Sequence, residues 1–340
     1  MSQYTLRWGE ETLALNLPAT WHVRGVLRPN EVPPVTSSLE SPIGMARLLT
    51  HLSPDSIVTI VIDDISRPRP VKEIIPHGMD CLREAGDRAE DFTIVPALGF
   101  HRLMSLEEVR NRTGLKDLGE GRVKNPACDD LDQMAHLGEP SHGTPVYIAK
   151  AVAEADLVIS IGCIEPHIIA SFGGGYKNII PGCAAHVTIT HNHSLNAAPA
   201  TFNMVGQPIK DNPMRQDLEE AVRLLESPVF LINTVLDADL NIVRVVAEDP
   251  IQAHRAGCEM SAQRFRMPVE GPADVVITNS FSMDSDLRQG VKALANKVRA
   301  VRRGGLMITL VRAEECVGVF GLAEKKLPFG HKALKLLAPY

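Results

Sequence analysis

The sequence predicts an α/β protein with two α/β domains, and three observations support this prediction. Short apolar runs rich in β-branched residues alternate with segments of helical character. These runs are apolar at nearly every position, which is typical of strands covered on both faces. The 340 residues are 44% hydrophobic and 22% charged, a balance that suits a globular protein with a sizeable core and about two domains.

Four buried strands are expected in the first part of the chain. They cover residues 56–63, 91–98, 157–162 and 229–235. A helix is expected over residues 70–86 (PVKEIIPHGMDCLREAG), because a proline suits the first turn of a helix. The segment MARLLTHL at residues 45–52 predicts another helix, which follows an irregular proline-rich stretch.

A domain boundary is expected within residues 266–274, which include two prolines and one glycine. It divides the chain into an N-terminal cofactor-binding domain over residues 1–267 and a C-terminal α/β domain over residues 268–340. In the second domain VVITNS and LMITLV predict strands, and a long amphipathic helix from Asp284 to Arg302 is expected between them.

Charge and composition exclude several kinds of partner. A net charge of -6 and a pI near 6.1 leave no basic field that would attract nucleic acid. The N-terminal residues mix charges into their apolar positions, and no stretch is long and apolar enough for a membrane span. Six cysteines without a CxxC pair argue against a zinc knuckle and a disulfide framework. These features predict a cytoplasmic protein with neither nucleic-acid nor membrane partners.

Polar residues follow three of the predicted strands directly. In open α/β sheets ligands bind at the carboxyl ends of the strands, so these residues are the first candidates for a site. They are Asp63, Asp64 and Arg67 after the first strand, His101 after the second, and Glu165 and His167 after the third. Taken singly, each group is better explained as a helix cap or a solvated loop.

A glycine-rich segment supplies a further candidate. Gly173, Gly174 and Gly175 directly precede Tyr176 and Lys177, and glycines allow a backbone to approach a ligand closely. The segment does not fit the GxxxxGK[ST] motif of nucleotide-binding loops, and a flexible turn is an alternative explanation. The GxGxxG motif is also absent after the predicted strands, which argues against a common NAD-dependent dehydrogenase.

Two pairs of side chains complete the candidates. His191 and His193 are two residues apart and would point the same way from an extended segment, as metal ligands often do. Gln289 and Lys292 are three residues apart and would share one face of the predicted helix. A structural or surface role explains either pair when it is considered alone.

The ordered set of these motifs resembles the nickel-pincer lactate racemase family. The motifs DDISRP, GFHR, IEPH, the glycines with Lys177, and HNH carry the resemblance over residues 57–194. The Gln289 and Lys292 pair is similar to the family's second-domain contribution. The resemblance implies two α/β domains with an active-site cleft between them.

The resemblance also implies a cofactor, the nickel pincer nucleotide. This cofactor is a pyridinium-3,5-bisthiocarboxylate mononucleotide whose two sulfur-containing carboxyl groups hold nickel. Lys177 matches the lysine joined to it by a thioamide, and His193 matches the protein ligand of the nickel. Asp64 is expected to orient the Arg67 loop or to contact the cofactor, with Asp63 as a substitute.

Further roles are carried over in the same way. His101 and His167 match the two catalytic acid–base residues, and histidine suits proton exchange near neutral pH. Arg67 is expected to bind the substrate carboxylate, with Gln289 and Lys292 as further substrate-binding residues. The glycines 173–175 are expected to make backbone contacts with the cofactor. His186 and His191 are expected to be structural or to support the metal ligand.

The function implied is that of a racemase or epimerase of a small 2-hydroxy acid, which works by reversible hydride transfer from the substrate C2. An epimerase of a sugar acid or hydroxy diacid with the same mechanism is the main alternative. A cofactor- or ligand-binding homologue without turnover and an NAD-dependent dehydrogenase are the alternatives from other classes. Family members continue beyond the position of Tyr340, so a shortened second domain is expected; the oligomeric state is left open.

Overall fold

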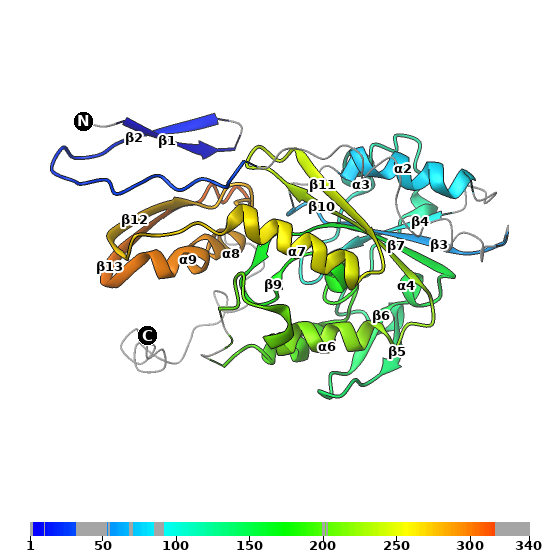
Figure 1. Ribbon diagram of the computed structural model, residues 1–340. Helices are drawn as coiled ribbons and strands as arrows, with labels where there is room; N and C mark the ends of the chain where they lie inside the picture. Colours follow the sequence, from blue (N-terminus) through cyan, green and yellow to red (C-terminus); the bar gives the residue numbers. More distant parts are fainter. Residues whose placement is uncertain are drawn as a thin grey trace. The chain divides into compact units, whose positions relative to one another are not determined.

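The computed structural model describes residues 3–9, 11–31, 53, 55–67, 71–84, 92–198, 201 and 203–316 (Figure 1). The chain divides into two compact units, of which the larger spans Val23–Pro272. The smaller unit combines Met1–His22 with the chain from Ala273 onward. The division after Pro272 falls close to the predicted boundary, but the first 22 residues group with the C-terminal part of the chain.

A mixed five-stranded sheet forms the centre of the larger unit (Figure 1). Its strands, in spatial order, are β11 (Ile242–Glu248), β10 (Val229–Leu236), β7 (Leu157–Cys163), β3 (Val58–Asp63) and β4 (Phe92–Ala97). Neighbours from β10 to β4 are parallel, and β11 is an antiparallel edge strand. The four predicted strands are therefore confirmed, whereas β11, which contains Arg244, was not predicted.

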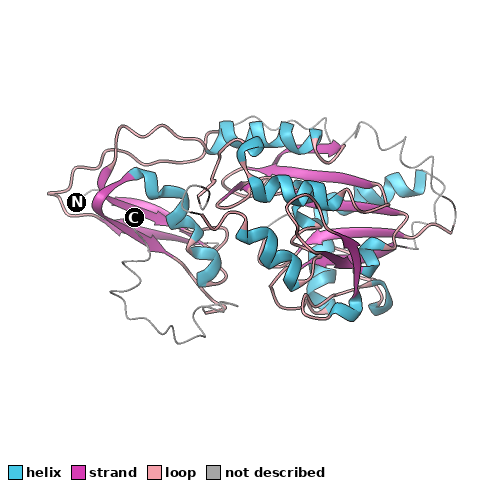
Figure 2. Cartoon of the chain, turned by 90° about the horizontal axis from the view of Figure 1, so that it is seen from below, coloured by secondary structure: helices cyan, strands magenta, loops and turns pink. Residues whose placement is uncertain are grey.

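Helices cover both faces of this sheet (Figure 2). One face, with Val58 and Ile60, packs against α2 (Val71–Glu84) and α3 (Leu106–Thr113). The opposite face, with Val61, packs against α4 (Lys150–Ala153), α5 (His186–Ser194) and α6 (Pro213–Val222), and α7 (Gln252–Phe265) covers β10 and β11 there. The fold class predicted from uniformly apolar strands is thus confirmed.

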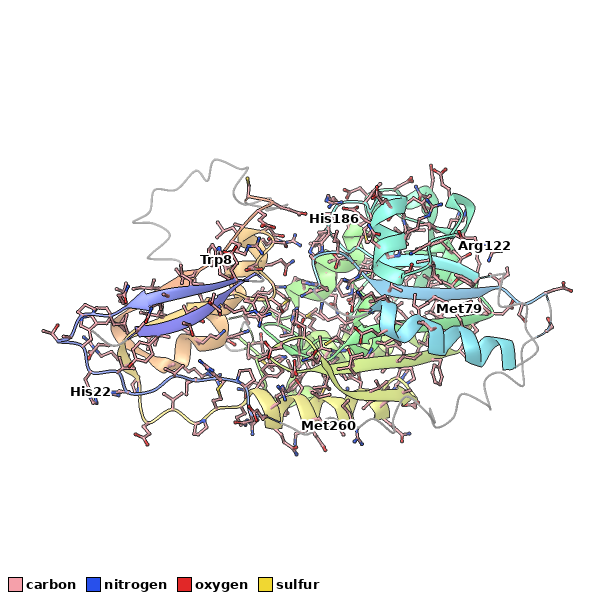
Figure 3. All side chains as sticks on the ribbon, turned by 90° about the horizontal axis from the view of Figure 1, so that it is seen from above. Trp8, His22, Met79, Arg122, His186 and Met260 are labelled. Carbon is pink, nitrogen blue, oxygen red and sulfur yellow. The ribbon has the colours of Figure 1, made fainter. Side chains whose placement is uncertain are left out.

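The predicted helix after the first strand is also confirmed. Its buried residues Val71, Ile74, Ile75 and Met79 recur at helical spacing and face the sheet (Figure 3). The helix predicted over residues 45–52 lies outside the described residues. Shorter elements complete the larger unit: η2 (Glu120–Arg122), η3 (Leu131–Gln133), β5 (Met134–Gly138), β6 (Val146–Ala149), β8 (Pro166–His167), β9 (Ser171–Phe172), η4 (Gly175–Asn178) and η5 (Ile209–Asp211).

The smaller unit contains two two-stranded sheets. The strands β1 (Gln3–Trp8) and β2 (Glu11–Asn16) form an antiparallel hairpin, while β12 (Ala273–Asn279) and β13 (Val301–Leu310) are parallel. The Asn279 side chain donates a hydrogen bond to the Arg7 carbonyl at 2.6 Å. Because this contact joins residues far apart in sequence, no local pattern could predict it.

The long helix predicted from Asp284 to Arg302 is wrong. The segment forms α8 (Leu287–Gly290), α9 (Lys292–Lys297) and the short η6 (Val298–Ala300). Gly290 accounts for part of the difference, because a Cβ there would lie 2.3 Å from the Val311 side chain. Close packing therefore requires the glycine, and glycine is a weak helix former.

The described helices and cysteines bear on the setting expected for the protein. Of the helices described, none combines the length and apolar character that crossing a membrane demands. The described cysteines Cys128, Cys163, Cys183, Cys258 and Cys316 are all free thiols.

Candidate active site

The candidate site lies where the three neighbouring strands β3, β4 and β7 end. Asp64 and Arg67 follow β3, His101 follows β4, and His167 follows β7 in the short strand β8. The strand β3 lies between β7 and β4 in the sheet. Arg67 therefore follows the middle strand, and His167 and His101 follow its two neighbours. The carboxyl ends of parallel neighbours meet at one edge of a sheet, as predicted from the sequence.

Side-chain contacts connect these strand ends. The Asp64 Oδ2 and His101 Nδ1 atoms are 2.5 Å apart. Arg67 Nη1 lies 3.5 Å from the Glu165 Oε1 of the loop after β7. The structure therefore brings together four of the residues singled out in the sequence.

Asp64 is a buried, ionised partner of His101. Burial alone would raise the pKa of this carboxyl, but the hydrogen bond and charge of His101, with the charge of Arg67 and a hydrogen bond from Ser66, hold the pKa well below its ordinary value. An ionised carboxylate favours a proton on His101 Nδ1 and leaves the lone pair on Nε2. Asp64 also accepts the Ser66 backbone N–H at 3.3 Å, so it orders the loop that leads to Arg67.

His167 has the opposite hydrogen-bond pattern. It is buried, and its Nδ1 accepts the backbone N–H groups of Ala170 at 3.1 Å and of Ile169 at 3.3 Å. Because Nδ1 accepts, the proton of the neutral ring is on Nε2. The two histidines therefore hold different tautomers, which the sequence alone did not indicate.

Lys177 lies on η4, directly after the glycine turn, and is half-buried. The N–H groups of Gly173 and Gly175 donate to the Glu165 carbonyl and to Asn233 Oδ1, each at 2.7 Å. Gly174 has a φ of 71°, and a Cβ there would lie 2.5 Å from Asn233 Oδ1. Packing thus explains these glycines, and their contact with a cofactor stays a prediction.

Backbone hydrogen bonds connect the Lys177 turn with the His101 loop. The Gly182 N–H donates to the Lys177 carbonyl at 3.2 Å, and the Gly99 N–H donates to the Gly182 carbonyl at 2.8 Å. Gly99 is two residues before His101. The proposed attachment point of the cofactor and one candidate base therefore belong to adjoining loops.

The extended conformation predicted for the HNH segment is wrong, because this segment lies in the helix α5. Residues two apart on a helix do not share a face, so His191 and His193 cannot act as a pair of ligands from one side. His191 Nδ1 lies 2.8 Å from Thr144 Oγ1, which in turn donates to the buried carboxylate of Asp217. This contact gives His191 the structural role expected from the resemblance.

His193 lies two helical turns after His186 and shares its face of α5. The His186 ring, labelled in Figure 3, packs against Phe100 with 4.9 Å between ring centroids, and Phe100 precedes His101. At the other end of α5, the Asn196 side chain donates to the Ile169 carbonyl of the His167 loop at 2.6 Å. The helix that carries His193, together with the residues directly after it, therefore contacts the loops of both histidines.

Gln289 and Lys292 belong to the smaller unit. Lys292 Nζ donates to Gln289 Oε1 at 2.5 Å, and Gln289 is buried with its N–H bonded to the Asp286 side chain at 2.7 Å. The two residues are neighbours as predicted, although they lie in separate short helices. Over the described ranges, no three His, Cys, Asp or Glu side chains cluster as a metal site.

Several polar residues that support the site were missed in the sequence. They are Ser66, Asn196, Asn212, Arg215, Asp217, Asn233 and His254. Only Asn212 carried a local signal, since Asn followed by Pro213 is typical of a helix start. Ser66 contacts Asp64 two residues away as well as the distant His101, and the others act through contacts between segments that are distant in sequence.

Fold and site together define an α/β protein whose polar side chains gather at the carboxyl ends of parallel strands, and comparison with known proteins specifies the family. Residues 8–203 match the family described as the lactate racemase N-terminal domain. This match covers more than half of the chain, which therefore belongs to the lactate racemase family.

Individual relatives give the same result. The chain is 30% identical to a lactate racemase of Thermoanaerobacterium thermosaccharolyticum over 94% of its own length and 76% of that protein. It is 32% identical to a lactate racemase of Lactiplantibacillus plantarum over 83% of its length and 66% of the relative. The chain thus spans about two thirds to three quarters of these proteins.

Solved structures confirm the fold. The lactate racemase apoprotein of Thermoanaerobacterium thermosaccharolyticum superposes with a TM-score of 0.81 at 28% identity, over 94% of this chain and 76% of that one. A Thermotoga maritima protein superposes with a TM-score of 0.62 at 20% identity, over 82% of this chain and 71% of that one. The second match supports the fold alone.

Proposed function

We propose that the chain racemises or epimerises a small 2-hydroxy acid with a nickel pincer nucleotide joined to Lys177. The chemistry that this group supplies when bound is reversible uptake of the substrate's C2 hydrogen as hydride. One observation carries the proposal: His101 and His167, at the ends of strands that flank the strand of Arg67, hold opposite tautomers. A racemase needs one such group to accept a proton and another to donate one.

The two histidines exchange the hydroxyl proton of the substrate. His101 Nε2 accepts this proton, and the ionised Asp64 stabilises the imidazolium that forms. For the return step His167 starts as an imidazolium, which has taken one proton from solvent; it donates its Nε2 proton to the oxygen on the opposite face and becomes neutral. The protonation states of the two rings are then exchanged, so the same groups serve the reverse reaction.

Arg67 binds the substrate carboxylate in this proposal. A guanidinium offers two parallel donors that match a carboxylate, and the side chain is only 12% exposed. Glu165, 3.5 Å away, competes with the substrate for this cation. Gln289 and Lys292 are proposed as further substrate contacts.

The donor set fits the proposed cofactor. His193 supplies an imidazole nitrogen, a ligand type that nickel favours, and Lys177 supplies the amine. Lys177 would hold the cofactor through a thioamide, whose formation from an amine and a thiocarboxylic acid would release one water. The mass of the chain therefore rises by that of the cofactor less one water.

The test combines mass and turnover. After co-expression with the enzymes that make the cofactor, intact-mass analysis should show modified Lys177, and the protein should invert a 2-hydroxy acid from a panel of lactate, sugar acids and hydroxy diacids. His101→Ala and His167→Ala should each keep the modification and lose full racemisation. Unmodified Lys177 without nickel in the wild-type protein, or wild-type turnover in either variant, would contradict the proposal.

A further inference from the structure

A buried arginine lies behind the glycine turn and takes no part in the proposed chemistry. Arg215, in the first turn of α6, has no exposed surface, and burial lowers the pKa of its guanidinium. The nearby Glu219 pairs with Arg255 through two bonds of 2.6 and 2.8 Å. A buried cation is costly, and an apolar side chain of similar volume often fills such a place without loss of stability.

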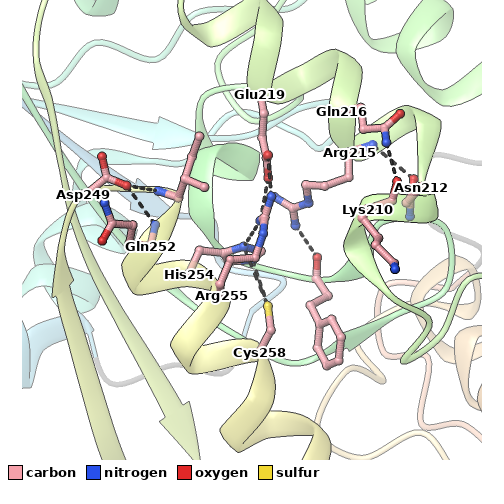
Figure 4. A network of polar contacts seen from close by, with 12 residues as sticks. Lys210, Asn212, Arg215, Gln216, Glu219, Asp249, Gln252, His254, Arg255 and Cys258 are labelled. Atoms are coloured by element: carbon pink, nitrogen blue, oxygen red, sulfur yellow. Dashed lines mark hydrogen bonds and ion pairs between the residues drawn. The ribbon is translucent and has the colours of Figure 1, made fainter.

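The guanidinium binds backbone carbonyl groups of the turn. Figure 4 shows Arg215 beside Glu219, His254 and Arg255. Arg215 Nη1 donates to the Gly174 carbonyl at 3.2 Å, and Nη2 donates to the Phe172 carbonyl. The carbonyl between them, that of Gly173, accepts from His254 Nε2 at 2.9 Å. Two wholly buried side chains thus hold three consecutive carbonyls.

His254 donates a hydrogen bond from Nε2 to the turn, and its protonation state does not change near neutral pH. Its Nδ1 accepts a hydrogen bond from Arg255 at 3.1 Å, so the ring proton is on Nε2 and points to Gly173. Burial, with the charges of Arg215 and Arg255, holds the pKa of His254 well below its ordinary value. The ring therefore stays neutral near neutral pH.

The turn at residues 172–174, which Arg215 and His254 hold through its carbonyl groups (the clamp), determines the backbone position of Lys177. The Lys177 N–H donates to the Gly174 carbonyl at 3.3 Å, so it shares this oxygen with Arg215. Gly174 and Gly175 have positive φ values of 71° and 62°, and glycine alone offers little resistance to a change of conformation. Contacts from outside the turn must therefore fix it.

The same helix start holds the His167 loop. Asn212 caps α6 by accepting the Arg215 N–H at 3.1 Å, and its Nδ2 donates to the Ile169 carbonyl at 2.8 Å. Ile169 is one of the residues whose N–H groups donate to His167 Nδ1. One turn of α6 thus connects the segment of Lys177 with that of His167.

We propose that Arg215 is a positioning residue, which fixes the Lys177 amine relative to His167 through the Gly174 carbonyl. The inference rests on the proposed function, since that function makes Lys177 the attachment point. Displacing a reacting group by about 1 Å costs on the order of 100-fold in rate, so loss of the clamp should be visible in attachment before it is visible in stability.

The experiment compares Arg215→Met and Arg215→Lys with Arg223→Met, a matched change at an exposed residue that ends the same helix. Thermal unfolding measures the fold of each full-length chain. Acetic anhydride labelling of the apoprotein, read by peptide mass spectrometry, measures the reactivity of Lys177 relative to the exposed Lys150. Intact mass after co-expression with the cofactor-making enzymes measures the attached fraction.

We expect folded Arg215→Met to show an attached fraction lowered about tenfold and a several-fold change in the Lys177 to Lys150 labelling ratio. Arg215→Lys should be intermediate, because lysine keeps the charge but not the fork of donors, and Arg223→Met should match the wild type. Wild-type attachment and labelling in a folded Arg215 variant would overturn the inference and leave the proposed function standing.

Two other outcomes also decide the matter. If Arg215→Met does not fold, Arg215→Lys replaces it with the same criteria. If the wild-type chain itself acquires no cofactor, the proposed function fails, and the labelling ratio of the apoprotein alone decides whether Arg215 positions Lys177.

Discussion

Asp64 determines which nitrogen of His101 carries the proton, because its ionised carboxylate faces Nδ1 at 2.5 Å. Asp64→Asn keeps the size of the side chain but offers an amide that accepts either tautomer. Since general acid–base catalysis contributes about 100- to 10,000-fold, we expect kcat to fall by at least about 100-fold with little change in KM. Steady-state kinetics of cofactor-loaded protein measures this, and an unchanged kcat would show that Asp64 does not serve His101.

The same residue predicts a pH dependence of stability. The pKa of Asp64 in the folded chain lies below its ordinary value of 3.8, so the unfolded chain binds this proton first as the pH falls. Asp64 therefore stabilises the fold above pH 3.8 and loses this effect below it. Denaturant unfolding of the wild type and Asp64→Asn should show a difference in unfolding free energy that shrinks on acidification below pH 4; a difference that grows there would contradict the assignment.

Glu165 partly neutralises the positive charge of Arg67 and so weakens the attraction between Arg67 and a substrate carboxylate. The two side chains are mostly buried, with exposed fractions of 12% for Arg67 and 21% for Glu165. Glu165→Gln removes the competing carboxylate, so we expect KM for a 2-hydroxy acid to fall about two- to tenfold, given the usual strength of such pairs. Substrate titration tests this, with Glu154→Gln as a control for loss of one acidic charge; an increased KM would assign Glu165 to substrate binding instead.

At the scale of elements, α5 separates the roles of two histidines that the sequence presents as a pair. His191 bonds to Thr144, while His193 lies on the face shared with His186. We expect His193→Ala to lose bound nickel and keep its fold. His191→Ala should keep nickel and lose about 1 kcal/mol of stability, the usual contribution of one hydrogen bond. Metal analysis and thermal unfolding measure both, and nickel retained by His193→Ala would exclude it as the ligand.

The contrast between α5 and the sheet shows what the sequence could and could not predict. Strands β3, β4, β7 and β10 were predicted because each is an apolar run, and the residues at their ends could be placed together by the rule for parallel sheets. The HNH segment fits an extended strand or a helix equally well, and burial of Thr188, Ile189 and Asn192 decides for the helix. This burial depends on tertiary contacts.

The side chains that support the site, such as Arg215 and His254, could not be predicted either, because their roles also depend on tertiary contacts. Arg215 and His254 are buried polar residues whose partners are carbonyl groups 41 and 81 residues earlier in the chain. On sequence alone a charged residue in an amphipathic helix indicates a solvated face. Only the fold shows that this face of α6 is directed at backbone groups inside the protein.

At the scale of the whole molecule, each unit of the chain carries residues that the family resemblance assigns to the substrate. The acid–base pair, Arg67 and Lys177 belong to the larger unit, and Gln289 with Lys292 belongs to the smaller one. The fold and family account for an isomerase, and the proposal adds that the C2 hydrogen leaves and returns without entering water. This retention of the hydrogen is the central claim.

Inversion of a 2-hydroxy acid deuterated at C2, carried out in ordinary water by the cofactor-loaded chain, tests this claim most directly. If the hydrogen moves as hydride between substrate and cofactor, the inverted product keeps its deuterium at C2, as mass spectrometry would show. Replacement of the deuterium by hydrogen from water during inversion would instead demonstrate proton abstraction at C2 and contradict the proposed mechanism.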